Sequence, residues 1–228
     1  RVDAKPLPQV QKAAAQNKAP AGRDLQGADV AVCYLHRSEI ARESLSPIAS
    51  LPDGAALVLG FVSPDLDLTD VGRAVQQAIG KEVRVVLVTD AGELCRPKGS
   101  TTLYQDAPDG RARVLLQGYS RRMIEDVFTM SVPLHSEDLK AGRIDMSLDE
   151  RLQALGRELE GKKPPFRISL YHTFALIYVD GASLSETFLM QALYESRKFP
   201  CPYIGGSGAP DVHGRTCVYD GRESLEGH

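Results

Sequence analysis

The segment from Phe174 to Asp211 constrains the fold most strongly, because its pattern is that of two strands joined by a helix. An apolar run with β-branched residues ends at Asp180-Gly181, where glycine accepts the dihedral angles that a turn demands. Ser183 precedes Glu186 by three residues, a spacing typical of a capping box at the start of a helix. Two prolines end this helix, and a second short strand then runs into a glycine-rich loop.

The segment from Ala56 to Gly92 repeats this strand–helix–strand pattern without repeating its residues. It has an apolar strand at Ala56 to Val62, a helical pattern from about Thr69 to Ile79, and a second strand at Val83 to Val88. A crossover of about 20 residues favours two parallel strands with the helix over one face. We therefore expect an α/β fold with a mixed, largely parallel sheet or sheets flanked by helices, built on these two pseudo-repeats.

The rest of the chain predicts further elements around the two units. Strands are expected at Asp29 to Leu35, Arg111 to Tyr119 and Ile124 to Leu134, and helices at Ser38 to Ala49 and, after a Ser147–Glu150 capping box, up to Glu160. Residues 1–27 are rich in Ala, Gln, Lys and Pro and are predicted to form an arm or linker. Residues 28–225 are predicted to form one domain, and Glu226 to His228 are interpreted as a tag remnant.

The composition argues against several classes of function. A net charge of −3 provides no basic surface for nucleic acid, and the absence of tryptophan further weakens base stacking. No apolar run approaches the about 20 residues of a membrane helix, so no membrane contact is expected. The four cysteines form no Cys-x-x-Cys pair or zinc spacing, which is typical of free thiols in a reducing cytoplasm.

Several short stretches resemble motifs of the FIST (F-box and intracellular signal transduction) sensory domains. They are Val88-Thr89-Asp90-Ala91-Gly92-Glu93-Leu94, Ile177-Tyr178-Val179-Asp180-Gly181, Ile204-Gly205-Gly206-Ser207-Gly208, and Gly214-Arg215-Thr216 with Val218-Tyr219-Asp220-Gly221. Each is a small-residue signature, and their order and spacing carry the resemblance, which covers about Ala28 to Arg222.

The resemblance implies the N-terminal half of a cytoplasmic input module in a chemotaxis receptor, a histidine kinase or a cyclic-dinucleotide enzyme. It implies a small-molecule ligand such as an amino acid, and an output module that is expected in the same full-length chain. Members of the family usually carry a second, C-terminal half, and we expect this chain to stop before one begins. Some members resemble haem-binding nitric oxide sensors, so haem is the alternative to a domain without a cofactor.

The predicted site lies at the carboxyl ends of the parallel strands, where loops and helix N-termini converge. Glycine lets backbone amides approach a ligand, a helix N-terminus favours a carboxylate, and acidic side chains such as Asp90, Glu93 and Asp180 suit an amine. This chemistry fits a ligand of amino-acid size, while turns that need glycine are the competing explanation. The candidate ligand-binding residues are Ser63, Thr89, Asp90, Ala91, Gly92, Glu93, Asp180, Gly181, Gly205, Gly206, Ser207 and Gly208.

Two alternatives stay open beside ligand binding without catalysis, for which no metal site is expected. A single axial histidine can hold haem, and the candidates are His36, at a strand end, and His172, expected on a buried strand. An enzyme of unassigned class could use Asp90 or Ser207 in the same cleft. A serine nucleophile elbow is disfavoured, because Pro210-Asp211 stands where its helix would start.

Overall fold

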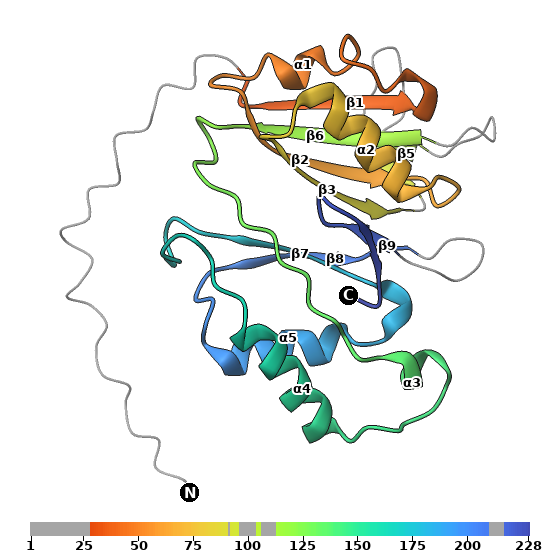
Figure 1. The fold of residues 1–228 in the computed structure, drawn as a ribbon, viewed down its shortest axis with the longest axis vertical. Coiled ribbons are helices and arrows are strands. Elements are labelled where there is room, and N and C mark those ends of the chain that lie inside the picture. The colour runs from red at the N-terminus through yellow and green to blue at the C-terminus, as the bar shows by residue number, and fades with distance from the viewer. Residues whose placement is uncertain (1–27, 91, 96–103, 106–112, 210–216) are drawn as a thin grey trace, which may run out of the picture.

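The computed structural model describes residues 28–90, 92–95, 104–105, 113–209 and 217–228 (Figure 1). Its large sheet has the strand order β1-β6-β2-β3-β9-β10, made of β1 (Val30–His36), β6 (Arg113–Ser120), β2 (Ala55–Val62), β3 (Arg84–Thr89), β9 (Cys217–Tyr219) and β10 (Ser224–Glu226). Two small sheets pair β7 (Ala175–Val179) with β8 (Tyr203–Ser207), and β4 (Glu93–Leu94) with β5 (Tyr104–Gln105). The predicted arm at residues 1–27 lies outside the described residues.

The first predicted strand–helix–strand unit is confirmed. β2 and β3 pair in parallel, and α2 (Leu68–Ile79) connects them. The Asp67 carboxylate caps α2 by accepting a hydrogen bond from the Asp70 amide at 2.8 Å. Gly80 ends the helix with a φ of 99°, a conformation that favours glycine.

The second unit is also confirmed, except for the start of its helix. β7 and β8 pair in parallel, and α5 (Glu186–Ser196) connects them after a 3-10 turn, η2 (Gly181–Ser183). The predicted Ser183 capping box is wrong, because Ser185 precedes the helix and makes no side-chain capping bond. Leu184, with a φ of 56°, changes the chain direction between turn and helix, and the Ser183 hydroxyl accepts a hydrogen bond from the Ser185 amide at 3.2 Å instead.

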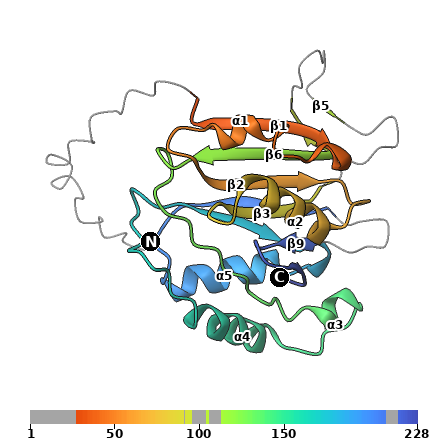
Figure 2. The same cartoon turned by 45° about the horizontal axis from the view of Figure 1, so that its top comes forward.

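The elements form four layers. Val58 and Val62 of β2 pack with α1 (Ser46–Ala49) and α2 in a first hydrophobic core. Leu57 and Leu59 point to the opposite face, because successive strand residues alternate, and they face β7 and β8. A second core packs β7 against α4 (Leu148–Glu160) and α5. Figures 1 and 2 show β7 and β8 between the large sheet and these two helices.

The mixed α/β class is confirmed, but parallel pairing is limited to the two units. Among the described strands of the large sheet, only β2 and β3 are parallel neighbours. β6 runs antiparallel to β1 and β2, and β9 runs antiparallel to β3 and β10. The large sheet is therefore mainly antiparallel around one parallel pair.

Among the other predicted elements, β1 and α4 are confirmed, with the Ser147–Glu150 capping box present. The strand predicted at Ile124 to Leu134 is wrong, because this segment runs outside the sheets and its side chains line a cavity. The helix predicted at Ser38 to Ala49 is also wrong. Only the 3-10 turn η1 (Arg37–Glu39) and the single turn α1 form there, since Pro47 suits the start of a helix and not its interior.

Candidate ligand-binding site

The carboxyl ends of the two units meet, as the predicted site requires. The Ala209 amide, just beyond β8, donates to the Thr89 carbonyl at the end of β3 over 3.1 Å. The Thr89 hydroxyl donates back to the Ala209 carbonyl at 3.0 Å, and the Asp90 amide bonds the Val62 carbonyl at 2.9 Å. The two bonds between Thr89 and Ala209 join the two units directly, while the Asp90 bond links β2 and β3 within the first unit.

The other predicted residues near this junction have different surroundings. Ser63 begins the turn after β2, and its amide donates to the Arg113 carbonyl at 3.0 Å. Gly92 is half-buried, and Glu93 belongs to β4, which pairs with β5. Ala91 lies outside the described residues.

Close packing of the backbone explains two of the glycines. A side chain at Gly205 would place its Cβ 1.7 Å from the Ile177 carbonyl oxygen on β7. A Cβ at Gly181 would lie 2.2 Å from the carbonyl oxygen of Gly208, whose own amide donates to the Val179 carbonyl at 2.9 Å. Gly206, by contrast, has open space where a Cβ would stand. Gly181 and Gly205 are therefore required by the approach of β7 to β8.

Two polar residues of the predicted site are held by the fold itself. The Asp180 side chain is 1% exposed and accepts hydrogen bonds from the Ala182 amide at 2.9 Å, the Lys140 ammonium at 2.5 Å and the Gly227 amide at 2.9 Å. The Ser207 hydroxyl donates to the Glu186 carboxylate at 2.6 Å. The Asp180 carboxylate therefore connects three segments of the chain and is not free to face an amine.

A large cavity lies elsewhere, between β2, β3 and β7–β8. Its volume is about 1040 Å³, at the upper end of the roughly 300–1,000 Å³ typical of ligand pockets. The segment 121–132 and the turn before β7 complete its walls. Of the residues predicted for ligand or haem, only His172 lines it, and this residue stands exposed in a turn, not on a buried strand as predicted. His36, at the end of β1, is not part of its lining.

The walls of this cavity are mainly apolar, and they determine what can fill it. Water needs two to four polar partners, and Leu57, Leu59 and Leu176 offer none, so this part of the wall suits an apolar group better than ordered water.

Aromatic residues are concentrated at the cavity. Four of the six phenylalanines of the chain line it, and so do two tyrosines; they are Phe128, Phe166, Phe174, Phe199, Tyr178 and Tyr203. The Tyr203 hydroxyl donates to the Phe199 carbonyl at 2.7 Å. The Tyr178 ring meets the Phe61 ring edge-on, with 6.2 Å between their centroids.

Tyr178 brings an unpaired polar group to these walls. Within the part of the chain that the structure describes, its hydroxyl makes no hydrogen bond. Burial, with a smaller contribution from the neighbouring Tyr119, raises the pKa of Tyr178, so the hydroxyl keeps its proton at neutral pH. It is therefore a hydrogen-bond donor available to a ligand.

The final residues 217–228, which we call the C-terminal strap, join the cavity to the second unit. Val218 and Leu225 of the strap line the cavity. The Gly227 carbonyl accepts a hydrogen bond from the Leu134 amide at 2.8 Å, and the His228 carbonyl accepts one from the Asp180 amide at 2.9 Å. Glu226 to His228, interpreted from the sequence as a tag remnant, thus pack into the domain.

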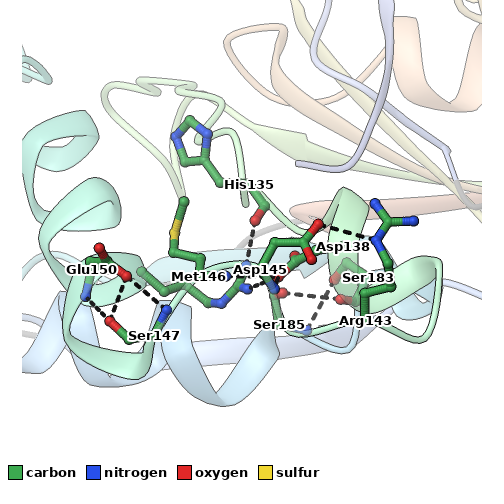
Figure 3. Close-up of polar contacts among 10 residues, drawn as sticks. His135, Asp138, Arg143, Asp145, Met146, Ser147, Glu150, Ser183 and Ser185 are labelled. Atoms are coloured by element: carbon green, nitrogen blue, oxygen red, sulfur yellow. Dashed lines mark hydrogen bonds and ion pairs between the residues drawn. The ribbon is translucent and has the colours of Figure 1, made fainter.

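A buried ion pair fixes the chain just after the wall segment 121–132. Arg151 of α4 is 1% exposed, donates to the His135 carbonyl and pairs with Asp138 at 2.7 Å. Burial acts to raise the pKa of Asp138, but the bonds from Arg151 and from the Asp145 and Leu139 amides outweigh it and hold this pKa at about 2. Figure 3 shows Asp138 among these partners, with the Ser147–Glu150 capping box beside it.

The sequence contained the strand that carries Tyr178 but gave no sign of the cavity. Leu176 and Tyr178 share one face of β7 because strand side chains alternate. The sequence does not show which of the two faces packs against the helices and which faces the large sheet. The cavity exists only because a two-stranded layer lies over a wider sheet, which depends on tertiary packing.

Two further properties of the described residues bear on function. No group of three or more His, Cys, Asp or Glu side chains in the described ranges could hold a metal ion. Within the same ranges, no helix combines the length and the apolar character needed to cross a membrane.

The comparisons with known proteins point to one family. A family model described as the FIST N domain matches residues 56–228, which is most of the chain and includes both units, the cavity walls and the strap. No curated protein matches the chain significantly.

Proposed function

Because the chain belongs to the FIST N domain family of signal-transduction sensory domains, we propose that it binds a small molecule and signals whether its site is occupied. The observation that carries this proposal is the cavity of about 1040 Å³ between the two sheets. Its size suits a metabolite, and its walls come from both units, so a bound molecule would contact both.

The C-terminal strap is the proposed route by which occupancy is reported. Val218 and Leu225 would contact the ligand, while Gly227 and His228 are bonded to the segment around Leu134 and Asp180. A ligand that makes these contacts in only one arrangement of the strap favours that arrangement by its differential affinity. The signal is then a shift between two positions of the strap.

The setting of the domain belongs to the same proposal. We place it in the cytoplasm, with an output module in the same full-length chain, such as that of a chemotaxis receptor, a histidine kinase or a cyclic-dinucleotide enzyme. The family resemblance of the motifs supports this setting. The ligand is bound and released unchanged, without catalysis.

A thermal-shift screen tests the proposal. We expect at least one compound in a set of amino acids and small aromatic and acyl metabolites to raise the melting temperature by more than about 2 °C at millimolar concentration. If none does, small-molecule binding is wrong for this domain. Turnover of the compound that binds, lost in Ser207→Ala, would instead assign an enzyme.

Haem is a second candidate, because His172 lines the cavity and a single axial histidine can hold haem. The visible spectrum after haem addition tests it. A Soret band that moves on binding and is lost in His172→Ala would support haem. A spectrum identical to that of free haem would exclude it. Replacement of the half-buried His36 by alanine serves as the control, because His36 does not line the cavity.

A further inference from the structure

We propose that the cavity binds a small, largely apolar aromatic molecule that carries a hydrogen-bond acceptor, and that the Tyr178 hydroxyl donates to this acceptor. This inference rests on the proposed sensing function and names the chemical class of its ligand. It also moves the ligand from the glycine loops, where the sequence placed it, to the space between the sheets.

The first support is the composition of the walls. Phe128, Phe166, Phe174 and Phe199 bring aromatic rings to the cavity from three different segments of the chain. Aromatic rings attract one another in edge-on and offset geometries, beyond the gain from burying their area. A planar aromatic ligand can use these contacts with several walls at once.

The second support is the single donor on β7. The Tyr178 ring is fixed against Phe61, and no partner within the described residues takes its hydroxyl proton. Two other tyrosine hydroxyls are already bonded within the protein: Tyr119 donates to the Gln117 side chain at 2.9 Å, and Tyr203 donates to the Phe199 carbonyl. A donor without a protein partner, set in mainly apolar walls, favours a ligand with an acceptor at that point.

The third support is the lack of buried charge to receive a zwitterion. Glu125, Asp126 and Arg167 line the cavity but are exposed. The Arg122 side chain is paired with Asp29 at 2.9 Å, and Asp220 accepts the Arg222 amide at 2.9 Å. Burying a charge without a partner is costly, so an amino acid with both termini charged is disfavoured inside.

The entrance of the cavity suits the same ligand. Met123, Met130 and Phe174 line it and are 55%, 37% and 49% exposed, so they mark where it opens to solvent. Methionine is flexible and polarisable and adapts to aromatic surfaces. An apolar molecule can therefore pass between these side chains.

Isothermal titration calorimetry with two probes tests the inference. Indole-3-carboxaldehyde has an aromatic ring system and a carbonyl acceptor, whereas 3-methylindole has the ring system without the acceptor. We expect both to bind, and Tyr178→Phe to weaken indole-3-carboxaldehyde about 5-fold while leaving 3-methylindole unchanged, since a net hydrogen bond corresponds to roughly a 2- to 12-fold change. Tyr194→Phe, on the exposed side of α5, is the matched control and should change neither affinity.

A second variant narrows the entrance, and circular dichroism verifies that each variant is folded. Met130→Trp should weaken both probes at least 5-fold, because the indole ring fills the opening. Equal affinities in wild type and Tyr178→Phe would overturn the role of the hydroxyl. Binding of an amino acid with no binding of either indole at millimolar concentration would overturn the ligand class but keep the sensing function. Failure of every compound would overturn both.

Discussion

At the scale of single residues, Asp180 shows how a motif residue can serve the fold. The family motif places an acidic residue before a glycine, which suggested a partner for a ligand amine. In the structure the carboxylate instead holds Lys140, the start of η2 and the C-terminal strap together. The sequence identified the position but could not give its role, because Lys140 and Gly227 are distant in the chain.

Asp180→Asn is expected to lower the free energy of unfolding by about 2 kcal/mol, because a hydrogen bond to a charged group is lost in a buried place. Urea denaturation measures this change. Asp145→Asn removes an exposed partner of Arg143 and should cost less than about 1 kcal/mol. Equal effects of the two substitutions would show that the Asp180 bonds contribute no more than a surface ion pair.

Asp138 predicts a dependence of stability on pH. Its pKa is about 2 in the folded chain and 3.8 in the unfolded one, so the unfolded chain takes up a proton first as the pH falls. The stabilising contribution is therefore complete above about pH 4 and is lost toward pH 2. Denaturation of wild type and Asp138→Asn between pH 2 and 6 should show a difference that shrinks below about pH 4. A difference independent of pH would contradict this reading.

At the scale of elements, the two strand–helix–strand units were predictable because their signals are local. Apolar runs, capping residues and helix-ending glycine or proline all lie within about 35 residues. The segment Ile124 to Leu134 has a similar apolar pattern but forms no strand, because its side chains pack against the cavity while its backbone lacks a neighbouring edge. Pattern alone does not separate these two cases.

The pairing of β7 with β8 predicts a sharp contrast between adjacent glycines. Gly205→Ala should destabilise the domain by about 3 kcal/mol or more, since its Cβ would overlap the Ile177 carbonyl oxygen. Gly206→Ala meets open space and should change stability by less than about 1 kcal/mol. Thermal unfolding followed by circular dichroism compares them, and similar midpoints for both variants would show that β8 can move away from β7.

At the scale of the whole molecule, the cavity forms because two neighbouring sheets differ in their number of strands. A two-stranded sheet with two helices covers only part of one face of a six-stranded sheet, and the remaining space is lined by segments without regular structure. The meeting of the two glycine-bearing edges was foreseen, and the Thr89–Ala209 bonds show it. The cavity lies between the sheets and could not be predicted from the sequence. Its presence depends on which face of each strand is buried when the sheets pack together.

The position of the ligand is the central claim, and NMR of protein labelled with ¹³C at the leucine and valine methyls and with ¹⁵N at the backbone amides tests it most directly. Saturating indole-3-carboxaldehyde should shift the methyl signals of Leu57, Leu59 and Leu176, and leave the backbone amides of Thr89, Gly92 and Gly206 nearly unchanged. Shifts confined to those three amides, with the cavity methyls unmoved, would place the ligand at the glycine loops and contradict the account.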